Sequence, residues 1–225
     1  MRIYRTGIAM TEALLKLMTW LSPSYPIGAY TYSHGMEWAV ETGDVRDPQT
    51  ARDWISACLA QGAGRTDSIF LAHAWRAEKE SDLNALQDLA ELVEALAPAK
   101  ERVLETTAQG TAFAEVTGAA WSGDSLPLPY PIAVGRAAAQ AEIPLSDTLA
   151  AFLQAFAANL ISAAVRLVPI GQTDGQRILA SLMAEILAVA EEALSSPLDC
   201  IGGNVVRADI AAMRHETQNV RLFRS

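Results

Sequence analysis

The segment 22–37 reads Ser22-Pro23-Ser24-Tyr25-Pro26-Ile27-Gly28-Ala29-Tyr30-Thr31-Tyr32-Ser33-His34-Gly35-Met36-Glu37, and it separates two stretches of helical character. Pro23 and Pro26 fix φ and move the residue before each of them out of the α region, so 22–26 cannot lie inside a helix. Gly28 frees the backbone for a turn. Three tyrosines and a histidine are unusual on a plain linker. We expect a rigid bend that either presents the tyrosines or packs them.

On both sides of this bend, apolar residues recur with the period of an α-helix. Asp47 before Pro48 is typical of an N-cap followed by proline at the first helical position. No alternation is long enough to predict a strand. The expected helices cover about 11–21, 36–42, 48–62, 65 onward, 82–96, 99–117, 130–141, 144–167, 173–193 and 207–215.

These helices predict an all-α, single-domain helical bundle of about ten helices over residues 1–225. Residues 1–9 and about 200–225 are expected to be flexible terminal segments. Thr11 is the expected N-cap of the first helix. Leu14, Leu15, Leu17, Met18 and Leu21 are expected to make the apolar face of the first helix. The residues expected inside include Leu83, Leu86, Leu89, Leu92, Val93 and Leu96 near the middle and Leu187 near the end. In the helix 99–117, Leu104 and Gly110 share one side, whose small residues would let another helix approach closely.

Charge and composition exclude several classes of protein. The net charge is −9, and no run of lysine or arginine supplies the basic patch that nucleic acid or an anionic membrane requires. The most apolar window, 149–170, contains Gln154, Asn159 and Arg166, which favours a buried helix over a membrane span. Cys58 and Cys200 are the only cysteines, so we expect no disulfide framework and a cytoplasmic protein.

The chemistry-bearing residues form no recognisable active site. His215-Glu216 begins like HExxH, but Asn219 stands at the closing position. The segment 171–177 lacks the Gly-Lys-Ser/Thr ending of a phosphate loop. We expect no enzyme activity, cofactor or metal site. One alternative stays open, a nickel-binding carrier that uses the imidazoles of His34 and His215 and the thiol of Cys200.

Two segments have the composition of protein–protein contacts. Tyrosine and arginine are enriched at binding hot spots. Tyr25, Tyr30 and Tyr32 form one group, and Arg214, Arg221 and Arg224 flank Leu222-Phe223 in the other. A loop that seals the core explains the tyrosines equally well, and a disordered terminus is the alternative for the tail.

Three motifs, in order along the chain, resemble the urease accessory protein UreF family. The first is Ser-Pro-x-x-Pro-x-Gly-x-x-x-Tyr-Ser-x-Gly-x-Glu at 22–37, with Ala29 where many members have a second glycine. The second, Ser-Ala-x-x-(Lys/Arg)-Leu-x-Pro-x-Gly-Gln, lies at 162–172. The third is the ending 215–225. The resemblance covers about residue 10 to the last residue.

The resemblance implies an all-α, non-enzymatic cytoplasmic homodimer. In that family the protein binds UreD (also called UreH) and recruits the GTPase UreG, which together deliver nickel to the urease apoprotein. It implies a GTPase-modulating adaptor, and an arginine finger from Arg166 or Arg224 is a further possibility. The predicted partner-binding residues are Tyr25, Tyr30, Tyr32, Ser33, His34, Glu37, Arg214, His215, Glu216, Gln218, Arg221, Leu222, Phe223 and Arg224.

Overall fold

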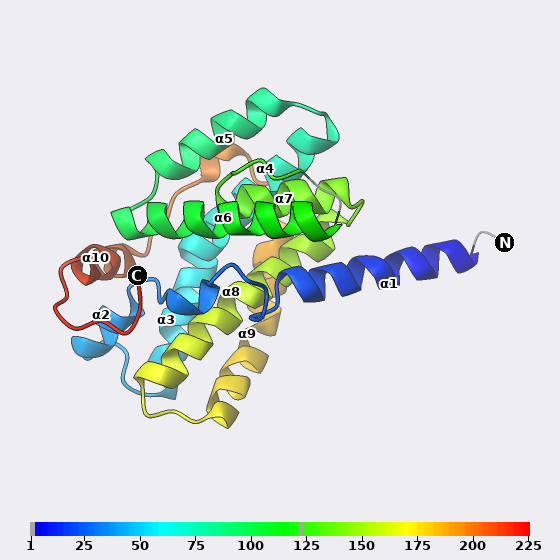
Figure 1. Ribbon diagram of the computed structural model, residues 1–225. Helices are drawn as coiled ribbons and strands as arrows, with labels where there is room; N and C mark the ends of the chain where they lie inside the picture. The colour runs from blue at the N-terminus through cyan, green and yellow to red at the C-terminus, as the bar shows by residue number, and fades with distance from the viewer. Residues whose placement is uncertain (1–2, 122–123) are drawn as a thin grey trace.

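The computed structural model describes the backbone of residues 3–121 and 124–225, and the side chains from Glu12 onward within those ranges. Ten α-helices and two short 3-10 helices make up the fold of these residues, and no strand occurs among them, which confirms the all-α prediction. The helices are α1 Ile3–Trp20, α2 Met36–Glu41, α3 Pro48–Gln61, α4 Ala63–Lys79, α5 Leu83–Ala95, α6 Lys100–Trp121, α7 Tyr130–Gln140, α8 Leu145–Leu167, α9 Gln172–Ala193 and α10 Val206–His215, with 3-10 turns η1 Ala29–Thr31 and η2 Leu198–Cys200 (Figure 1).

Helix α4 occupies the centre of the bundle, where it packs against α3, α5, α7, α8 and α9. Its apolar residues are largely buried, among them Ile69, Phe70 and Leu71. Helices α2 and α10 lie together at one end, next to the C-terminus (Figure 1). The tyrosine segment and the tail therefore meet at the same end of the molecule.

Helix α8 is the one described helix that is long and apolar enough to cross a membrane, and half of its apolar window is buried inside the protein. It packs against α9, α4 and α3. Leu149, Leu153 and Leu160 have no exposed surface. We therefore describe α8 as a core helix, as the sequence predicted.

Local capping explains where several helices begin. Asp47 accepts a hydrogen bond from the Thr50 backbone N–H at 2.8 Å, and the Thr50 hydroxyl lies 3.1 Å from the Asp47 N–H, which completes a capping box. Asp82 caps α5 by accepting from the Ala85 N–H at 3.0 Å. The predicted start near Thr11 is wrong, because α1 begins at Ile3. No proline stands between Ile3 and Thr11 to interrupt the helix. Residues 1–2, part of the predicted flexible segment 1–9, lie outside the described residues.

The predicted apolar face of α1 is not covered at three positions. Leu17 is 3 % exposed, whereas Leu14, Leu15 and Met18 are 56 %, 57 % and 63 % exposed. Helix α1 extends away from the other helices (Figure 1), so the turn that carries Leu17 and Trp20 supplies its buried contacts. Leu83, Leu96 and Leu187, expected inside, are 60 %, 51 % and 61 % exposed, and Leu96 lies one residue beyond the end of α5.

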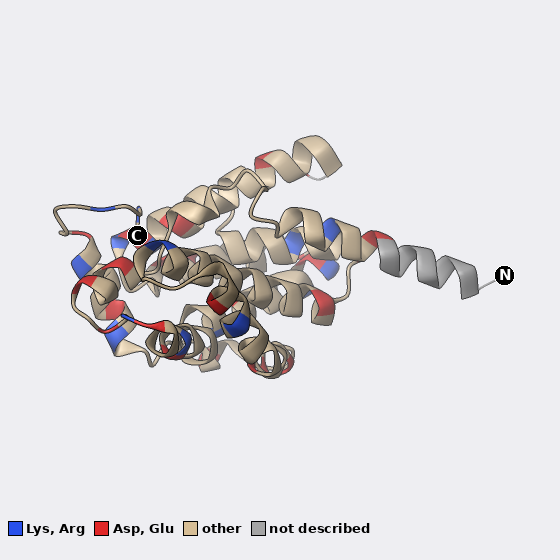
Figure 2. Cartoon of the chain, turned by 90° about the horizontal axis from the view of Figure 1, so that it is seen from below, with Lys and Arg blue, Asp and Glu red and all other residues tan. Residues whose placement is uncertain are grey.

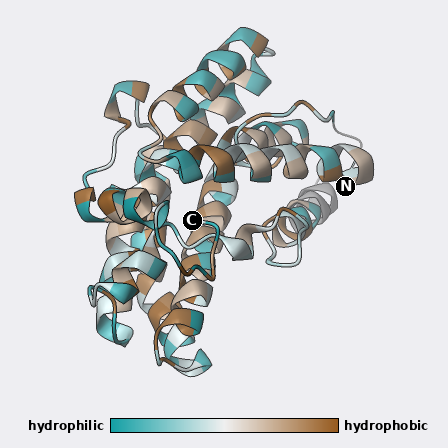
Figure 3. Cartoon of the chain, turned by 60° about the vertical axis from the view of Figure 1, so that its left-hand side comes forward, coloured by the Kyte–Doolittle hydropathy of each residue, from teal (hydrophilic) through white to brown (hydrophobic). Residues whose placement is uncertain are grey.

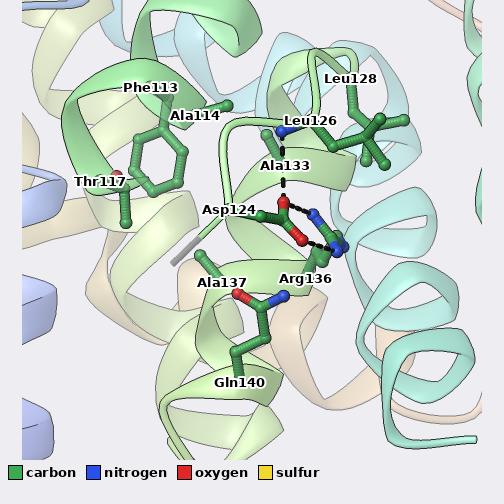
Figure 4. A pocket seen from close by; sticks show the side chains of 10 residues that line it. All are labelled: Phe113, Ala114, Thr117, Asp124, Leu126, Leu128, Ala133, Arg136, Ala137 and Gln140. Atoms are coloured by element: carbon green, nitrogen blue, oxygen red, sulfur yellow. Dashed lines mark hydrogen bonds and ion pairs between the residues drawn. The ribbon is translucent and has the colours of Figure 1, made fainter. Parts of the chain in front are cut away.

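A close backbone approach occurs at Gly110 in α6. A Cβ placed there would lie 1.9 Å from the Leu128 carbonyl oxygen. The loop that reaches this glycine is also held by Arg136, which ion-pairs with Asp124 and, at 2.8 Å, with Glu78. Figure 4 shows the Arg136 side chain pointing at Asp124 across this loop. The small residues around Gly110 were predicted to permit such an approach, and the segment that approaches is the entry to α7.

We predict that Gly110→Ala destabilises the protein by about 2 kcal/mol or more, because the added methyl group overlaps backbone atoms that have no rotamer to change. Urea unfolding followed by circular dichroism measures this. Gly171→Ala is the matched control, since its Cβ would meet nothing nearer than 4.0 Å. Equal stability of the two variants would contradict the close approach.

Candidate protein-interaction site

The tyrosine segment forms a bend whose rings point in different directions. Tyr25 is buried, with its hydroxyl 2.8 Å from the Thr117 hydroxyl, and burial raises its pKa. Tyr32 is 3 % exposed, whereas Tyr30 is 58 % exposed. The segment therefore packs two rings against the body and presents one.

Positive φ angles at the end of this segment bring α2 against α10. His34 has φ 52° and Gly35 has φ 73°. Gly35 is the N-cap of α2, which begins at Met36. A Cβ on Gly35 would lie 2.5 Å from the backbone nitrogen of Ala212 in α10. Glycine is thus required here both for its backbone angle and for the contact between the helices.

The C-terminal tail, residues 216–225, runs along the bend and is held by backbone hydrogen bonds. The Glu37 carboxylate accepts from the N–H groups of Leu222 at 2.7 Å and Phe223 at 2.9 Å. The Arg224 N–H donates to Thr31 O at 2.7 Å, and the Ser33 N–H donates to Ser225 O at 2.6 Å. Figure 3 looks onto the face where the C-terminus lies. The prediction that residues 200–225 are flexible concerns motion and stays a prediction.

Alternate tail residues face opposite ways, as in an extended strand. Phe223 is 4 % exposed and Ser225 is 1 % exposed, whereas Leu222 is 64 % exposed and Arg224 is also exposed. The Phe223 ring lies 4.3 Å from the Arg166 guanidinium carbon, and Arg166 also donates to Tyr30 O at 2.7 Å. Arg166 thus links α8, the bend and the tail.

Carboxylates of α6 continue this arrangement into the interior. His215 is fully buried, with Nδ1 2.7 Å from Glu101 and Nε2 3.2 Å from Glu37. Glu101 also accepts from Arg221 at 2.7 Å. One turn further along α6, Glu105 lies 3.1 Å from His34 Nε2 and 2.9 Å from Arg102.

The charges around Glu105 determine its ionisation. Burial alone would raise its pKa, but His34 and Arg102 outweigh burial and hold the pKa at about 2. For Asp67, which accepts from Arg102 at 2.9 Å, burial dominates and the pKa is raised although Arg102 and His34 act in the opposite direction. Glu105 is therefore a firmly charged anion in the interior.

The outer side of α10 and the tail carry exposed apolar side chains. Val206, Ile210 and Met213 are 63 %, 49 % and 48 % exposed and share one face of α10 by their spacing. Val220 and Leu222 are 83 % and 64 % exposed in the tail. We call these five residues the apolar stripe. The same two segments contain Arg207, Arg214, Arg221 and Arg224, and Figure 2 shows basic positions around the C-terminus of this acidic chain.

The structure brings most of the predicted partner-binding residues together and gives them different surroundings. Ser33, His34 and Glu37 lie under the tail with His215 and Phe223, and Glu216 caps α6 by accepting from the Lys100 N–H at 2.8 Å. Tyr30, Arg214, Leu222 and Arg224 are exposed, Arg221 is exposed while bound to Glu101, and Gln218 is half-buried. Tyr25 and Tyr32 face the body. Their role in partner binding stays a prediction.

Sequence reasoning missed the carboxylates that hold this site. Glu101, Glu105 and Gln109 repeat at intervals of four on one face of α6, next to Gly110. These polar residues run into the close contact at Gly110, and that position beside a buried contact is the signal that they too are covered. Sequence reasoning also found no partner for His34, which the structure places beside Glu105.

The residues of the nickel-carrier alternative do not form a ligand set. Among the described side chains, no three or more His, Cys, Asp or Glu residues are grouped so as to hold a metal ion. His34 and His215 each face glutamates, and Cys200 is exposed at η2. The geometry therefore gives this alternative no support.

Comparison with known proteins identifies similar chains over nearly the full length. A family model described as UreF matches residues 45–183. A urease accessory protein UreF of Rhodopseudomonas palustris is 52 % identical over 222 residues, which covers 95 % of this chain and 94 % of the relative. Proteins of the same name from Cereibacter sphaeroides and Bradyrhizobium diazoefficiens are 54 % and 50 % identical, covering 96 % and 95 % of this chain and 100 % and 92 % of the relatives.

We predict that Glu37→Gln loosens the tail, because an amide offers one acceptor oxygen where the carboxylate offers two. Hydrogen bonds to a charged group contribute about 1.5–3 kcal/mol each, so exchange of the Leu222 and Phe223 amide hydrogens should accelerate about tenfold or more. Hydrogen exchange followed by NMR measures this. Glu41→Gln, an exposed change on the same helix, is the control. Unchanged protection in Glu37→Gln would refute this account of the tail.

A second prediction concerns acid stability. The pKa of Glu105 is about 2 in the folded chain against an ordinary 4.5, so its stabilising effect is present above pH 4.5 and is lost as the pH falls toward 2. The difference in unfolding free energy between the wild type and Glu105→Gln should therefore shrink by about 2 kcal/mol from pH 6 to pH 3. Urea titrations at each pH measure the difference, and Glu115→Gln, exposed on the same helix, should show no comparable change.

Proposed function

Because this chain belongs to the UreF family of urease accessory proteins, we propose that it is a non-enzymatic adaptor in nickel insertion into apo-urease. The family predicted from the three sequence motifs is confirmed by the family model and the relatives. In this proposal the chain bridges UreD (UreH) and the GTPase UreG, and modulates that GTPase. Nickel is cargo of the assembly and needs no resident site in this chain.

The observation that carries the proposal is the apolar stripe beside the folded tail. Its five side chains are large, apolar and about half or more exposed, and they come from two adjoining segments. Exposed large apolar residues on two consecutive segments, with arginines in the same segments, are typical of a protein-binding site. The stripe therefore suits a partner with an apolar surface and an acidic rim.

The fixed tail conformation supports such binding. Glu37 holds the backbone at 222 and 223, so Phe223 faces inward and Leu222 faces outward. A side chain that is already positioned loses less conformational entropy on binding than one on a disordered tail. The contacts of Glu37 and His215 thus act on partner binding through the tail, without touching the partner.

We propose further that the protein is a cytoplasmic homodimer, as the family resemblance implies. The exposed face of α1 with Leu14, Leu15 and Met18 is distinct from the apolar stripe and is available for subunit contact. Helix α1 lies at the opposite end of the molecule from α10 (Figure 1). Dimer formation through α1 would leave the stripe free for other partners.

We predict that Ile210→Glu and Leu222→Glu each reduce the amount of UreD or of UreG that co-purifies with this chain at least tenfold, when the chain is mixed with both partners. The reason is that a carboxylate placed in an apolar contact must be desolvated without a partner. Thermal stability should be unchanged, because both side chains are exposed in the free chain. The matched control is Leu83→Glu, a 60 % exposed leucine on α5. Wild-type capture of both partners by both variants would contradict the proposed docking surface.

A further inference from the structure

A recess separate from the apolar stripe lies where the start of α4, the junction of α5 and α6, and the loop 201–203 meet. Its volume is about 130 Å³. A protein cavity of about 150 Å³ accommodates benzene, so this recess accepts a group of about six heavy atoms. The walls are largely apolar, with Phe70, Leu96 and Ile201 among them.

The charged side chains that line the recess are those of Asp67, Arg102 and Asp209. With two carboxylates and one guanidinium, their net charge is negative. Arg102 is already shared between Asp67 and Glu105, each at 2.9 Å, so two carboxylates compete for one guanidinium. Asp209, in the first turn of α10, adds a second carboxylate to the lining. Burial raises the pKa of Asp209, and burial also raises the pKa of Asp67 more than Arg102 and His34 lower it.

We propose that this recess receives the guanidinium or ammonium group of an arginine or lysine side chain from a partner protein. The charged end pairs with Asp209 and Asp67, and the methylene stem lies against Phe70, Leu96 and Ile201. Leu96 is 51 % exposed, so a partner that contacts it buries apolar surface around the inserted side chain. A desolvated basic side chain with an apolar surround has the composition of a binding hot spot.

Two other kinds of occupant fit less well. A neutral apolar group would remove water from Asp67 and Asp209 and give no charge in return. A metal ion lacks a ligand set here, because no group of three or more metal-binding side chains occurs in the described part of the chain. A basic group with a short alkyl stem satisfies both the charge and the shape.

The test uses the full chain and small probes, so it does not depend on the proposed urease partners. The probe is n-butylguanidinium in physiological salt, and N-butylacetamide is the neutral probe of similar size. Amide signals of Gly62, Gly202 and Gly203, which line the recess, report binding in NMR titrations. We expect saturable shifts with the cation and none with the neutral probe. Equal shifts with both probes would overturn the assignment of a cation site.

Asp209→Asn should weaken binding of n-butylguanidinium about tenfold, as the loss of one charge-assisted contact implies. Asp199→Asn, an exposed change of the same charge outside the recess lining, is the control and should bind as the wild type does. Asp67→Asn tests the inner carboxylate. Because Asp67 also pairs with Arg102, Asp209→Asn decides the question if Asp67→Asn unfolds. Wild-type affinity in Asp209→Asn would overturn the proposal.

A last comparison distinguishes a basic side chain of a partner protein from a free polyamine. Acetyl-Gly-Arg-Gly-amide stands for a protein side chain, and spermidine stands for a free polyamine. We expect the peptide to shift the same three glycine amides and to compete with n-butylguanidinium. Binding of spermidine without binding of the peptide would overturn the assignment to a partner's side chain.

Discussion

The candidate site depends on the hydrogen bonds that the Glu37 carboxylate accepts from the tail. Its two oxygens accept from two consecutive backbone N–H groups of the tail and lie against His215. A buried N–H left without an acceptor costs about 1–3 kcal/mol. Without the Glu37 side chain, the observed position of the tail would therefore be less stable. Together with the Arg224 N–H bond to Thr31 O and the Ser33 N–H bond to Ser225 O, these two bonds fix the alternation of side chains from Leu222 to Ser225. A single acidic residue at the start of α2 therefore helps to decide which tail residues are exposed and which are buried.

Two glutamates of α6 extend this polar network into the core. Glu101 pairs with His215 and Arg221, and Glu105 pairs with His34 and Arg102. Buried ion pairs are weak evidence of net stability, but removing one partner is costly because the other charge stays buried. Such a network penalises alternative tail conformations more than it stabilises the observed one. Its physical effect is to specify one arrangement of α2, α6, α10 and the tail.

The features that the sequence predicted well are local, and those it missed are not. The caps at Asp47 and Asp82 lie within three residues of their partners, so the starts of α3 and α5 follow from short motifs. The tail contacts join residues as far apart as Ser33 and Ser225, which no periodicity reveals. The exposed leucines of α1 have the spacing of a core face, because spacing reports amphipathicity but not whether another helix covers the face. Tyr30 and Tyr32 differ in exposure for a similar reason, since their environment is set by the turn at η1 and by the tail.

The tail is held mainly by polar contacts and by one buried ring, that of Phe223. Fixing the backbone of each residue costs about 1–2 kcal/mol, a cost that recurs at every position of the tail. The compensating contacts are concentrated at Glu37, Arg166 and Ser33, while Val220 and Leu222 stay 83 % and 64 % exposed in the free chain. Covering a leucine side chain contributes about 1.5–3 kcal/mol. A partner that covers Leu222 thus stabilises the same tail conformation that presents it, so that folding of the tail and binding of the partner reinforce each other through the Glu37 bonds.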